Sequence, residues 1–183
     1  MNNIINQDLN ETVSNAKKSY FKPLKMIATS VDNKIFEAYA YNEVSLMRQT
    51  HLASKIKIKI NDEIKMEELI CDGVLVSTSA GSTAYNLSAH GSILPLDSNI
   101  LALTPISAFR PRRWRGALLS ETNKIEFNIL DNKDRSSSVT ADNIEFRDID
   151  KVNIESSNDN KCLVLFDSKH SIEDKILNEQ FNF

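Results

Sequence analysis

The apolar residues of this chain recur mostly at every second position, which is typical of β-strands with one buried face. Residues 55–60 read Lys-Ile-Lys-Ile-Lys-Ile, so one face of this strand would be apolar and the other charged. The same alternation recurs at residues 24–28, 36–40 and 125–129. The polar pairs Asp32-Asn33 and Asn61-Asp62 follow two of these runs and favour tight turns. The pattern therefore predicts strands that turn back on one another.

Helical periodicity is expected at both ends of the chain. Four apolar positions share one helical face and predict a helix that ends near Phe21 and Pro23: Leu9, Val13, Ala16 and Tyr20. Ser171 with Asp174 predicts the first turn of a C-terminal helix that carries Ile172, Ile176, Leu177 and Phe181. The strands around Val152 and Ile154 and at 162–166 are expected to form the last strand pair.

Many short strands with few helices indicate a mainly β protein, and we predict a β-sandwich with a few flanking helices. A chain of 183 residues is long enough to bury one sizeable core, so a single domain is the first expectation. Hydrophobic residues make up 41% and charged residues 26%, which is typical of a globular protein. The formal net charge of −3 argues against a general binder of polyanions.

The cysteines and the N-terminal sequence bear on the compartment. Cys71 and Cys162 have no His or Cys neighbour at metal-ligand spacing, so both are interpreted as reduced thiols of the core. The N-terminus is polar and has no apolar signal region. No apolar run approaches the ~20 residues of a membrane-spanning helix. A cytoplasmic protein without membrane contact is therefore expected.

The most informative segment covers residues 72–85, where a strand pattern gives way to a loop of small residues. The apolar run 73–76 fits a buried strand, and the seven residues 77–83 are all small. A helix-compatible stretch, 84–90, then stops at Gly91. Such a helix start would let backbone N–H groups approach a phosphate, with the helix dipole favouring its charge. On local evidence alone, a Ser-capped helix after a tight turn explains the segment as well.

A hydrolytic triad of Ser82, His90 and Asp72 is the catalytic alternative for this segment. No Gly-x-Ser-x-Gly elbow surrounds Ser82, and His90 would lie on the same short helix as this nucleophile. Hydrolase chemistry is therefore not expected. The remaining histidines, His51 and His170, have no carboxylate or cysteine companions at metal-ligand spacing, and no metal-ligating residue is predicted.

A basic cluster occupies residues 109–115. It contains Phe109, Arg110, Arg112, Arg113, Trp114 and Arg115. Guanidinium groups beside aromatic rings can bind a phosphate chain or single-stranded nucleic acid. Contact with a neighbouring subunit and pairing with surface carboxylates are the other interpretations. Because no matching basic stripe occurs elsewhere, nucleic acid is not the expected partner.

Several short motifs occur in the order found in one enzyme family. Asn42-Glu43 lies within the run 40–45, and Asp72-Gly73 precedes the small-residue loop. Residues 81–89 then read Gly-Ser-Thr-Ala-Tyr-Asn-Leu-Ser-Ala, and the segments 103–106 and 109–118 follow. In this order the chain resembles the ATP-dependent NAD kinases, above all their alphaproteobacterial branch. The resemblance extends along nearly the whole chain.

The resemblance implies a role for each motif in holding the dinucleotide. Asn42 and Glu43 would grip a ribose, whose two hydroxyls suit a carboxylate next to an amide. Asp72 would contact the dinucleotide near its nicotinamide side. The loop and helix start would line the same site with Ala80, Thr83, Ala84, Tyr85, Asn86, Leu87 and Ser88. Without the resemblance, Asn42-Glu43 would be interpreted as a solvated strand end, and Ala84 and Leu87 as core residues.

Two family features are absent from the 183 residues. No Gly-Gly-Asp-Gly motif occurs, and its aspartate is the family's general base on the ribose 2′-hydroxyl. Ile144 stands where the family often has a glutamine, so no ligand contact is assigned to the Asp142-Asn143-Ile144 run. We interpret residues 1–23 as a helical remnant or linker from an N-terminal α/β domain, 24–168 as the dinucleotide-binding β-sandwich and 169–183 as a helical tail.

The resemblance implies the NAD-binding C-terminal part of an NAD kinase, an enzyme that phosphorylates the 2′-hydroxyl of the adenosine ribose of NAD to give NADP. ATP and a divalent metal ion such as Mg²⁺ would take part, and a homo-oligomer is expected. The 183 residues alone are expected to lack turnover, because the general-base aspartate is absent. A general base typically raises the rate of such a reaction by about 10²–10⁴-fold. They would be a fragment, a gene product with a misplaced start or a degenerate copy. A non-catalytic dinucleotide-binding or regulatory module is the alternative, ahead of a nucleic-acid-binding β-domain.

Overall fold

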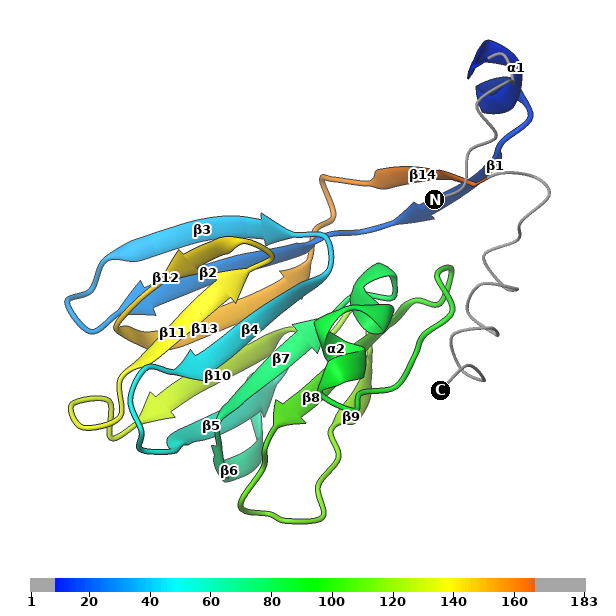
Figure 1. The fold of residues 1–183 in the computed structure, drawn as a ribbon. Helices are drawn as coiled ribbons and strands as arrows, with labels where there is room; N and C mark the ends of the chain where they lie inside the picture. Colours follow the sequence, from blue (N-terminus) through cyan, green and yellow to red (C-terminus); the bar gives the residue numbers. More distant parts are fainter. Residues whose placement is uncertain (1–8, 167–183) are drawn as a thin grey trace.

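The computed structural model describes residues 9–166, which form two six-stranded sheets and a separate two-stranded sheet (Figure 1). The expected mainly β sandwich is confirmed. The helices are α1 (Leu9–Ser14), the 3₁₀ helix η1 (Ala80–Thr83) and α2 (Tyr85–Ser88). The strands, in chain order, are β1 (Lys17–Phe21), β2 (Leu24–Ser30), β3 (Ile35–Ala40), β4 (Glu43–Arg48), β5 (Ser54–Ile60), β6 (Glu63–Cys71), β7 (Gly73–Ser77), β8 (Ile100–Ile106), β9 (Ala117–Ser120), β10 (Ile125–Leu130), β11 (Ser137–Ala141), β12 (Ile144–Phe146), β13 (Ile149–Ser156) and β14 (Cys162–Phe166).

The first sheet has the strand order β3-β2-β13-β10-β5-β6, and it contains the strands that the period-two pattern predicts. The alternating isoleucines of β5 are buried, and Ile58 lies opposite the fully buried Phe127 of β10. The lysines of β5 lie on the other face, where Lys59 forms an ion pair with Glu126 at 2.9 Å. Alternation along the sequence has therefore sorted apolar and charged side chains onto opposite faces.

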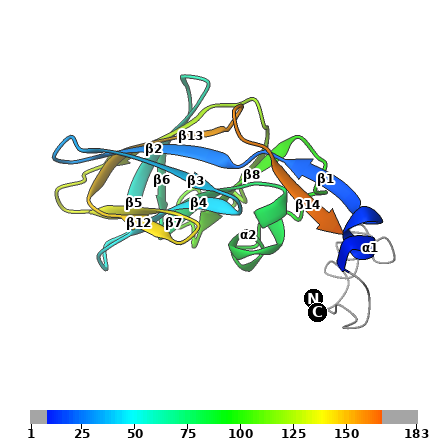
Figure 2. The same ribbon diagram turned by 90° about the horizontal axis from the view of Figure 1, so that it is seen from above.

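The second sheet has the order β12-β11-β4-β7-β8-β9 and positions the candidate site. Val44 and Leu46 of β4, with Val74 and Val76 of β7, point into the core between the two sheets. Every residue of β7 is buried, because η1 and α2 pack on its outer face (Figure 2). The strand is apolar throughout because both of its faces are covered.

The two-stranded sheet corrects the expectation of one long N-terminal helix. Only α1 is helical, and residues 17–21 form β1, which pairs antiparallel with β14. The partner strand lies more than 140 residues away along the chain (166 − 17 = 149 for the outer pair), so local periodicity could not reveal the pairing. The last two strands are also not a pair, since β13 lies between β2 and β10. The predicted C-terminal helix lies outside the described residues.

The cysteine prediction is correct for one thiol and wrong for the other. Cys71 is buried, and burial raises the pKa of its thiol from 9.0 to about 12. Cys162 is only half-buried, because it begins a strand of the small two-stranded sheet rather than of the sandwich. Neither residue is in a disulfide.

No helix within residues 9–166 is long and apolar enough to cross a membrane.

Candidate functional site

Strand pairing brings Asn42 and Glu43 next to the small-residue loop. Glu43 opens β4 and lies opposite Ser77, the last residue of β7, so the loop that follows β7 starts beside the Asn42-Glu43 pair. The backbone N–H of Thr78 donates to the carbonyl oxygen of Asn42 at 2.9 Å, and the Thr78 hydroxyl donates to Tyr41 at 2.7 Å. Two motifs that are 34 residues apart (77 − 43) thus form one surface.

Glu43 has an unusual carboxylate. Its Oε2 atom is buried and has no hydrogen-bond partner among the described residues. Burial, followed by the negative charge of Asp142, raises the pKa of this carboxyl above its ordinary value. A half-buried carboxylate with an unmatched oxygen is costly for the folded protein unless a ligand hydroxyl or amide donates to it. Asn42 is exposed beside it, with its side chain free to reach the same ligand.

Asp142 holds the backbone of this pair in place. Its carboxylate accepts hydrogen bonds from the backbone N–H groups of Tyr41 at 2.6 Å, Asn42 at 2.9 Å and Glu43 at 3.2 Å. The residue lies in the turn between β11 and β12 with a φ of 51°, a conformation that Asp tolerates well. No ligand contact was predicted at Asp142, and its carboxylate instead supports the backbone of residues 41–43.

Tyr85 lies over the outer face of β4 and β7 and connects the two ends of the candidate site. Its hydroxyl contacts the sulfur of Met47 at 3.7 Å. Burial raises the pKa of this phenol, and the carboxylates of Glu43 and Asp72 raise it further. The phenol is therefore within electrostatic reach of both carboxylates. From Glu43 to Met47, which lies opposite Gly73, β4 rises by about 13 Å, so the face suits an elongated ligand.

Asp72 joins β6 to β7 at the far end of this face. Its Oδ1 accepts a hydrogen bond from Nε of Arg48 at 2.6 Å, and its backbone N–H donates to Ile106 at 3.0 Å. The second carboxylate oxygen is available to a ligand on the exposed side, since the Asp72 side chain is 38% exposed. Arg48 is not among the predicted site residues. An arginine at a strand end gives no local signal of pairing with a residue 24 positions away.

The loop itself is tightly packed against Asn42. A Cβ atom at Gly81 would lie 2.2 Å from the carbonyl oxygen of Asn42, so only glycine fits. The Ser82 hydroxyl donates to the Ser79 carbonyl at 2.8 Å and accepts from the Leu94 N–H at 2.9 Å. Ser82 therefore ties the loop to the segment before β8. It neither caps α2 nor offers an exposed nucleophile, which removes the hydrolase alternative.

The remaining predicted site residues differ in accessibility. Asn86 is fully buried, and its amide bonds to Ser82 and Ser92 carbonyls and to the Thr104 hydroxyl within the protein. Ala84, Leu87 and Ser88 are exposed, so packing of Ala84 and Leu87 into the core is wrong. Ala80 and Thr83 are half-buried at the loop surface. The fold therefore places Asn86 in support of the loop and the other residues where a ligand can reach them.

The expected helix dipole is not realised. The stretch 84–90 contains only α2, which has four residues, and η1 before it also has four. Ala84 separates the two with a non-helical backbone. Aligned peptide dipoles add up only over several turns, so this loop lacks a helix N-terminus for a phosphate. Surface shape and side-chain polarity remain as the means of recognition.

Comparison with known proteins decides the family. Residues 41–164 match the model of the ATP-NAD kinase C-terminal domain. The NAD kinase of Hyphomonas neptunium is 47% identical over 183 residues, covering all of this chain and 72% of the relative. The NAD kinase of Xylella fastidiosa is 49% identical over 179 residues, covering 98% and 69%. This chain belongs to the NAD kinase family.

Solved structures agree with the fold of an NAD kinase C-terminal domain. Yeast NADH kinase complexed with NADH gives a TM-score of 0.80 at 24% identity, covering 91% of this chain and 50% of the yeast chain. An NAD kinase from Archaeoglobus fulgidus in complex with ATP gives a TM-score of 0.68 at 22% identity, covering 84% and 57%. At such identities the likeness supports the architecture alone.

The arginine cluster lies in the connection between β8 and β9, next to the Asp72 end of the face, because Arg110 pairs with Ile70 near the end of β6. All four arginines are exposed, and the guanidinium groups of Arg110 and Arg112 lie 5.5 and 5.4 Å from the centre of the Phe109 ring. No ion pair with a described residue is formed by the four arginines, so pairing with surface carboxylates is not observed in residues 9–166.

The raised pKa of Glu43 predicts a pH-dependent stability. The unfolded carboxyl titrates near 4.5, and the folded one titrates higher. Between these values the folded protein keeps a proton that the unfolded chain has released, so stability falls as the pH rises through this window. We expect Glu43→Gln, which cannot ionise, to raise the melting temperature at pH 7 but not below pH 4.5. Thermal melts followed by circular dichroism measure this difference.

The matched control for the melts is Glu63→Gln on β6. Lys65 donates to this exposed glutamate at 2.6 Å and lowers its pKa, which is the opposite direction. Removing its charge should therefore not raise the melting temperature at pH 7. A Glu43→Gln protein that melts below its parent at pH 7 would show that the carboxylate is matched inside the protein.

Proposed function

We propose that this protein takes part in the phosphorylation of NAD to NADP by ATP, and that the face of β4 and β7 between Glu43 and Asp72 binds NAD. The main observation in favour is the buried, unpartnered Oε2 atom of Glu43 beside the exposed Asn42. A ribose diol supplies the hydroxyl donors that this carboxylate lacks. The family membership supports the substrate class.

In the proposed site, different residues bind different parts of the dinucleotide. Glu43 and Asn42 would hold a ribose in a fixed orientation, and Asp72 would bind near the nicotinamide at the other end. Tyr85 would cover the middle with an apolar ring and keep water from the face between them. Ala80, Thr83, Ala84, Leu87 and Ser88 would line the same side, with Asn86 fixing the loop from beneath.

A divalent ion such as Mg²⁺ would enter with the phosphates of ATP, whose charge it would neutralise. Within residues 9–166 no group of three His, Cys, Asp or Glu side chains is placed to hold a metal. We therefore propose no step through a metal held by this domain. The contribution that we propose for these residues is to bind and orient NAD.

Domain boundaries at residues 23 and 168, homo-oligomer formation and a cytoplasmic location stay predictions. The pairing of β1 with β14 provides a physical link between the segment 17–21 and the end of the sandwich. Truncations at these boundaries should therefore be designed to remove or keep both strands together.

Calorimetric titration of NAD tests the proposed ribose contact. We expect Glu43→Gln and Asn42→Ala each to weaken NAD binding by about 1–3 kcal/mol, because the first removes the negative charge that strengthens the bond to a ribose hydroxyl and the second removes the amide partner. Both variants should fold, since neither side chain has a hydrogen-bond partner in the protein that the structure shows. The control is again Glu63→Gln, on the opposite sheet. Unchanged affinity in both Glu43→Gln and Asn42→Ala would contradict the assignment.

A further inference from the structure

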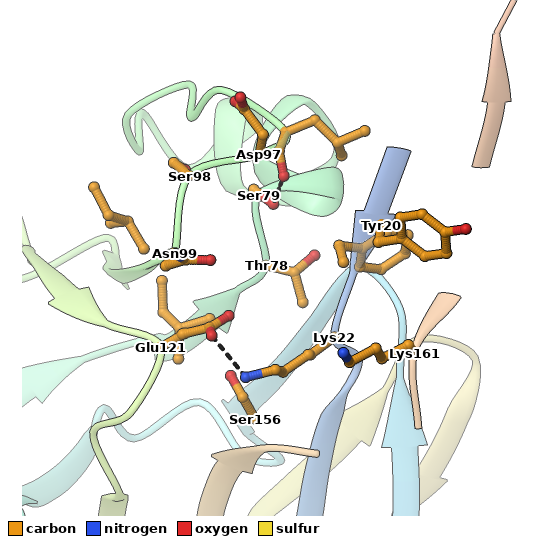
Figure 3. Close-up of a pocket in the computed structure, with 14 residues that line it drawn as sticks. Tyr20, Lys22, Thr78, Ser79, Asp97, Ser98, Asn99, Glu121, Ser156 and Lys161 are labelled. Atoms are coloured by element: carbon orange, nitrogen blue, oxygen red, sulfur yellow. Dashed lines mark hydrogen bonds and ion pairs between the residues drawn. The ribbon is translucent and has the colours of Figure 1, made fainter. Parts of the chain in front are cut away.

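A second polar cavity lies where the small β1–β14 sheet meets the end of the sandwich (Figure 3). It has a volume of about 190 Å³. Its walls come from the segments 20–22, 78–79 and 96–101, together with Glu121, Ser156 and Lys161. None of the residues proposed to bind NAD lines it. The cavity is therefore separate from the Glu43–Asp72 face.

Ser156, at the end of β13, is the most informative group in this cavity. The residue is 8% exposed, and its Oγ atom has no hydrogen-bond partner among the described residues. A buried hydroxyl without a partner is costly and therefore uncommon in folded proteins. The residue lines the cavity, so a molecule bound there can satisfy the hydroxyl.

Two lysines provide positive charge next to this hydroxyl. Lys22 is half-buried and forms an ion pair with Glu121 at 2.7 Å, which leaves two of its three N–H donors for another partner. Lys161 extends its ammonium group into the same space (Figure 3), and no ion pair between it and another residue of 9–166 is found. The two carboxylates of the cavity are Glu121, which is already paired, and Asp97, which is exposed at the rim.

We propose that this cavity is an anion site that binds the phosphates of a di- or triphosphate. Lys22, Lys161 and the Ser156 hydroxyl would donate to the phosphate oxygens, and these charge-assisted bonds are stronger than neutral ones. The volume corresponds to roughly six waters at about 30 Å³ each, which is more than one phosphate ion fills. The site would therefore accept a chain of phosphates.

The proposed anion site and the proposed NAD site share one structural element. Thr78 and Ser79 line the cavity, and the next residues, Ala80 to Thr83, begin the surface of the NAD site. The Ser79 hydroxyl donates to Leu96 at 2.8 Å and so fixes the cavity wall to the loop. The anion proposal does not depend on the NAD assignment, because its own ligand and residues can be tested alone.

The experiment is calorimetric titration of the 183-residue chain with pyrophosphate and inorganic triphosphate. We expect saturable binding that weakens about tenfold in Lys161→Met and in Ser156→Ala, as expected for loss of a charge-assisted bond. Ser156→Ala removes an unmatched buried hydroxyl, so its melting temperature without ligand should equal or exceed that of the parent. This combination of kept stability and lost binding separates a ligand contact from a structural role.

The matched control is Lys124→Met, because Lys124 is 74% exposed and lies outside the cavity. Its affinity for pyrophosphate should equal that of the parent. Absence of saturable binding to both phosphates, or equal weakening in Lys124→Met and Lys161→Met, would overturn the proposal. The phosphates could belong to a nucleoside triphosphate or to inorganic polyphosphate, and titration with ATP beside inorganic triphosphate identifies the source as the tighter ligand of the two.

Discussion

Replacing Gly81 with valine should abolish NAD binding and lower the free energy of unfolding by about 1–3 kcal/mol, the usual cost of overpacking. The reason is contact with backbone atoms, since a Cβ atom at this position would lie 2.2 Å from the oxygen and 2.5 Å from the carbonyl carbon of Asn42. Backbone cannot rotate away as a flexible side chain can. The loop would have to move off Asn42 and would break the Thr78–Asn42 hydrogen bond.

Calorimetry with NAD and thermal melts measure the two effects of Gly81→Val separately. Ala117→Val is the control, because it adds bulk at an exposed position of β9 and should change neither value. If Gly81→Val folds and binds NAD as tightly as its parent, the loop takes no part in recognition.

Glycine is needed at position 81 because the chain approaches Asn42 closely, and not because the backbone is left-handed. Gly116 alone among the four glycines has a positive φ.

Replacing Asp142 with alanine should weaken NAD binding by about 10–100-fold and destabilise the protein by about 2 kcal/mol. Three backbone N–H groups lose a charged acceptor, and bonds to charged groups contribute about 1.5–3 kcal/mol each before water replaces them at exposed positions. The Asn42-Glu43 pair would then lose its fixed orientation. Calorimetry with NAD and chemical denaturation give the two values.

Asp148→Ala is the matched control for Asp142→Ala. Asp148 also lies in a turn with positive φ, at 55°, so both variants place alanine in the same backbone region. The difference between them isolates the hydrogen bonds that Asp142 accepts. In addition, Asp142→Asn should lower the pKa of Glu43, because one cause of its rise is the Asp142 charge. Equal NAD affinity in the parent and Asp142→Ala would contradict a positioning role.

The strands of the sandwich were predictable because a strand with one buried face has alternating apolar and polar residues in its own sequence. In β5 the isoleucines face the core and the lysines face solvent. In β10 the apolar residues Ile125, Phe127 and Ile129 also face the core. The turns were predictable for an equally local reason, since Asn33, Asn61 and Asp131 all adopt a positive φ that Asn and Asp tolerate. Family membership was predictable because the order of the short motifs can be read directly along the sequence.

The helical interpretation of residues 9–21 failed where the decisive partner was remote. Tyr20 has a suitable spacing for an apolar helix face, yet it lies in β1 opposite Leu163. The edge of β14 satisfies the backbone of this segment, and no pattern within the segment itself contains that information. The helix expected at 84–90 is also shorter than predicted, since only Tyr85–Ser88 is helical. The Asn86 side chain on this helix bonds to Ser92 and Thr104, and local periodicity does not reveal these contacts.

The sequence by itself determined the fold class, most strands and turns, the family and the motifs of the proposed site. Only the tertiary structure decided how those motifs meet: Asp142 accepts bonds from residues about 100 positions away, and Gly81 packs on Asn42 across two strands. It also revealed the unmatched oxygens of Glu43 and Ser156. Periodicity reports which face of an element is buried, but the partner of a buried polar atom depends on strand order and register, which arise only when distant segments pair.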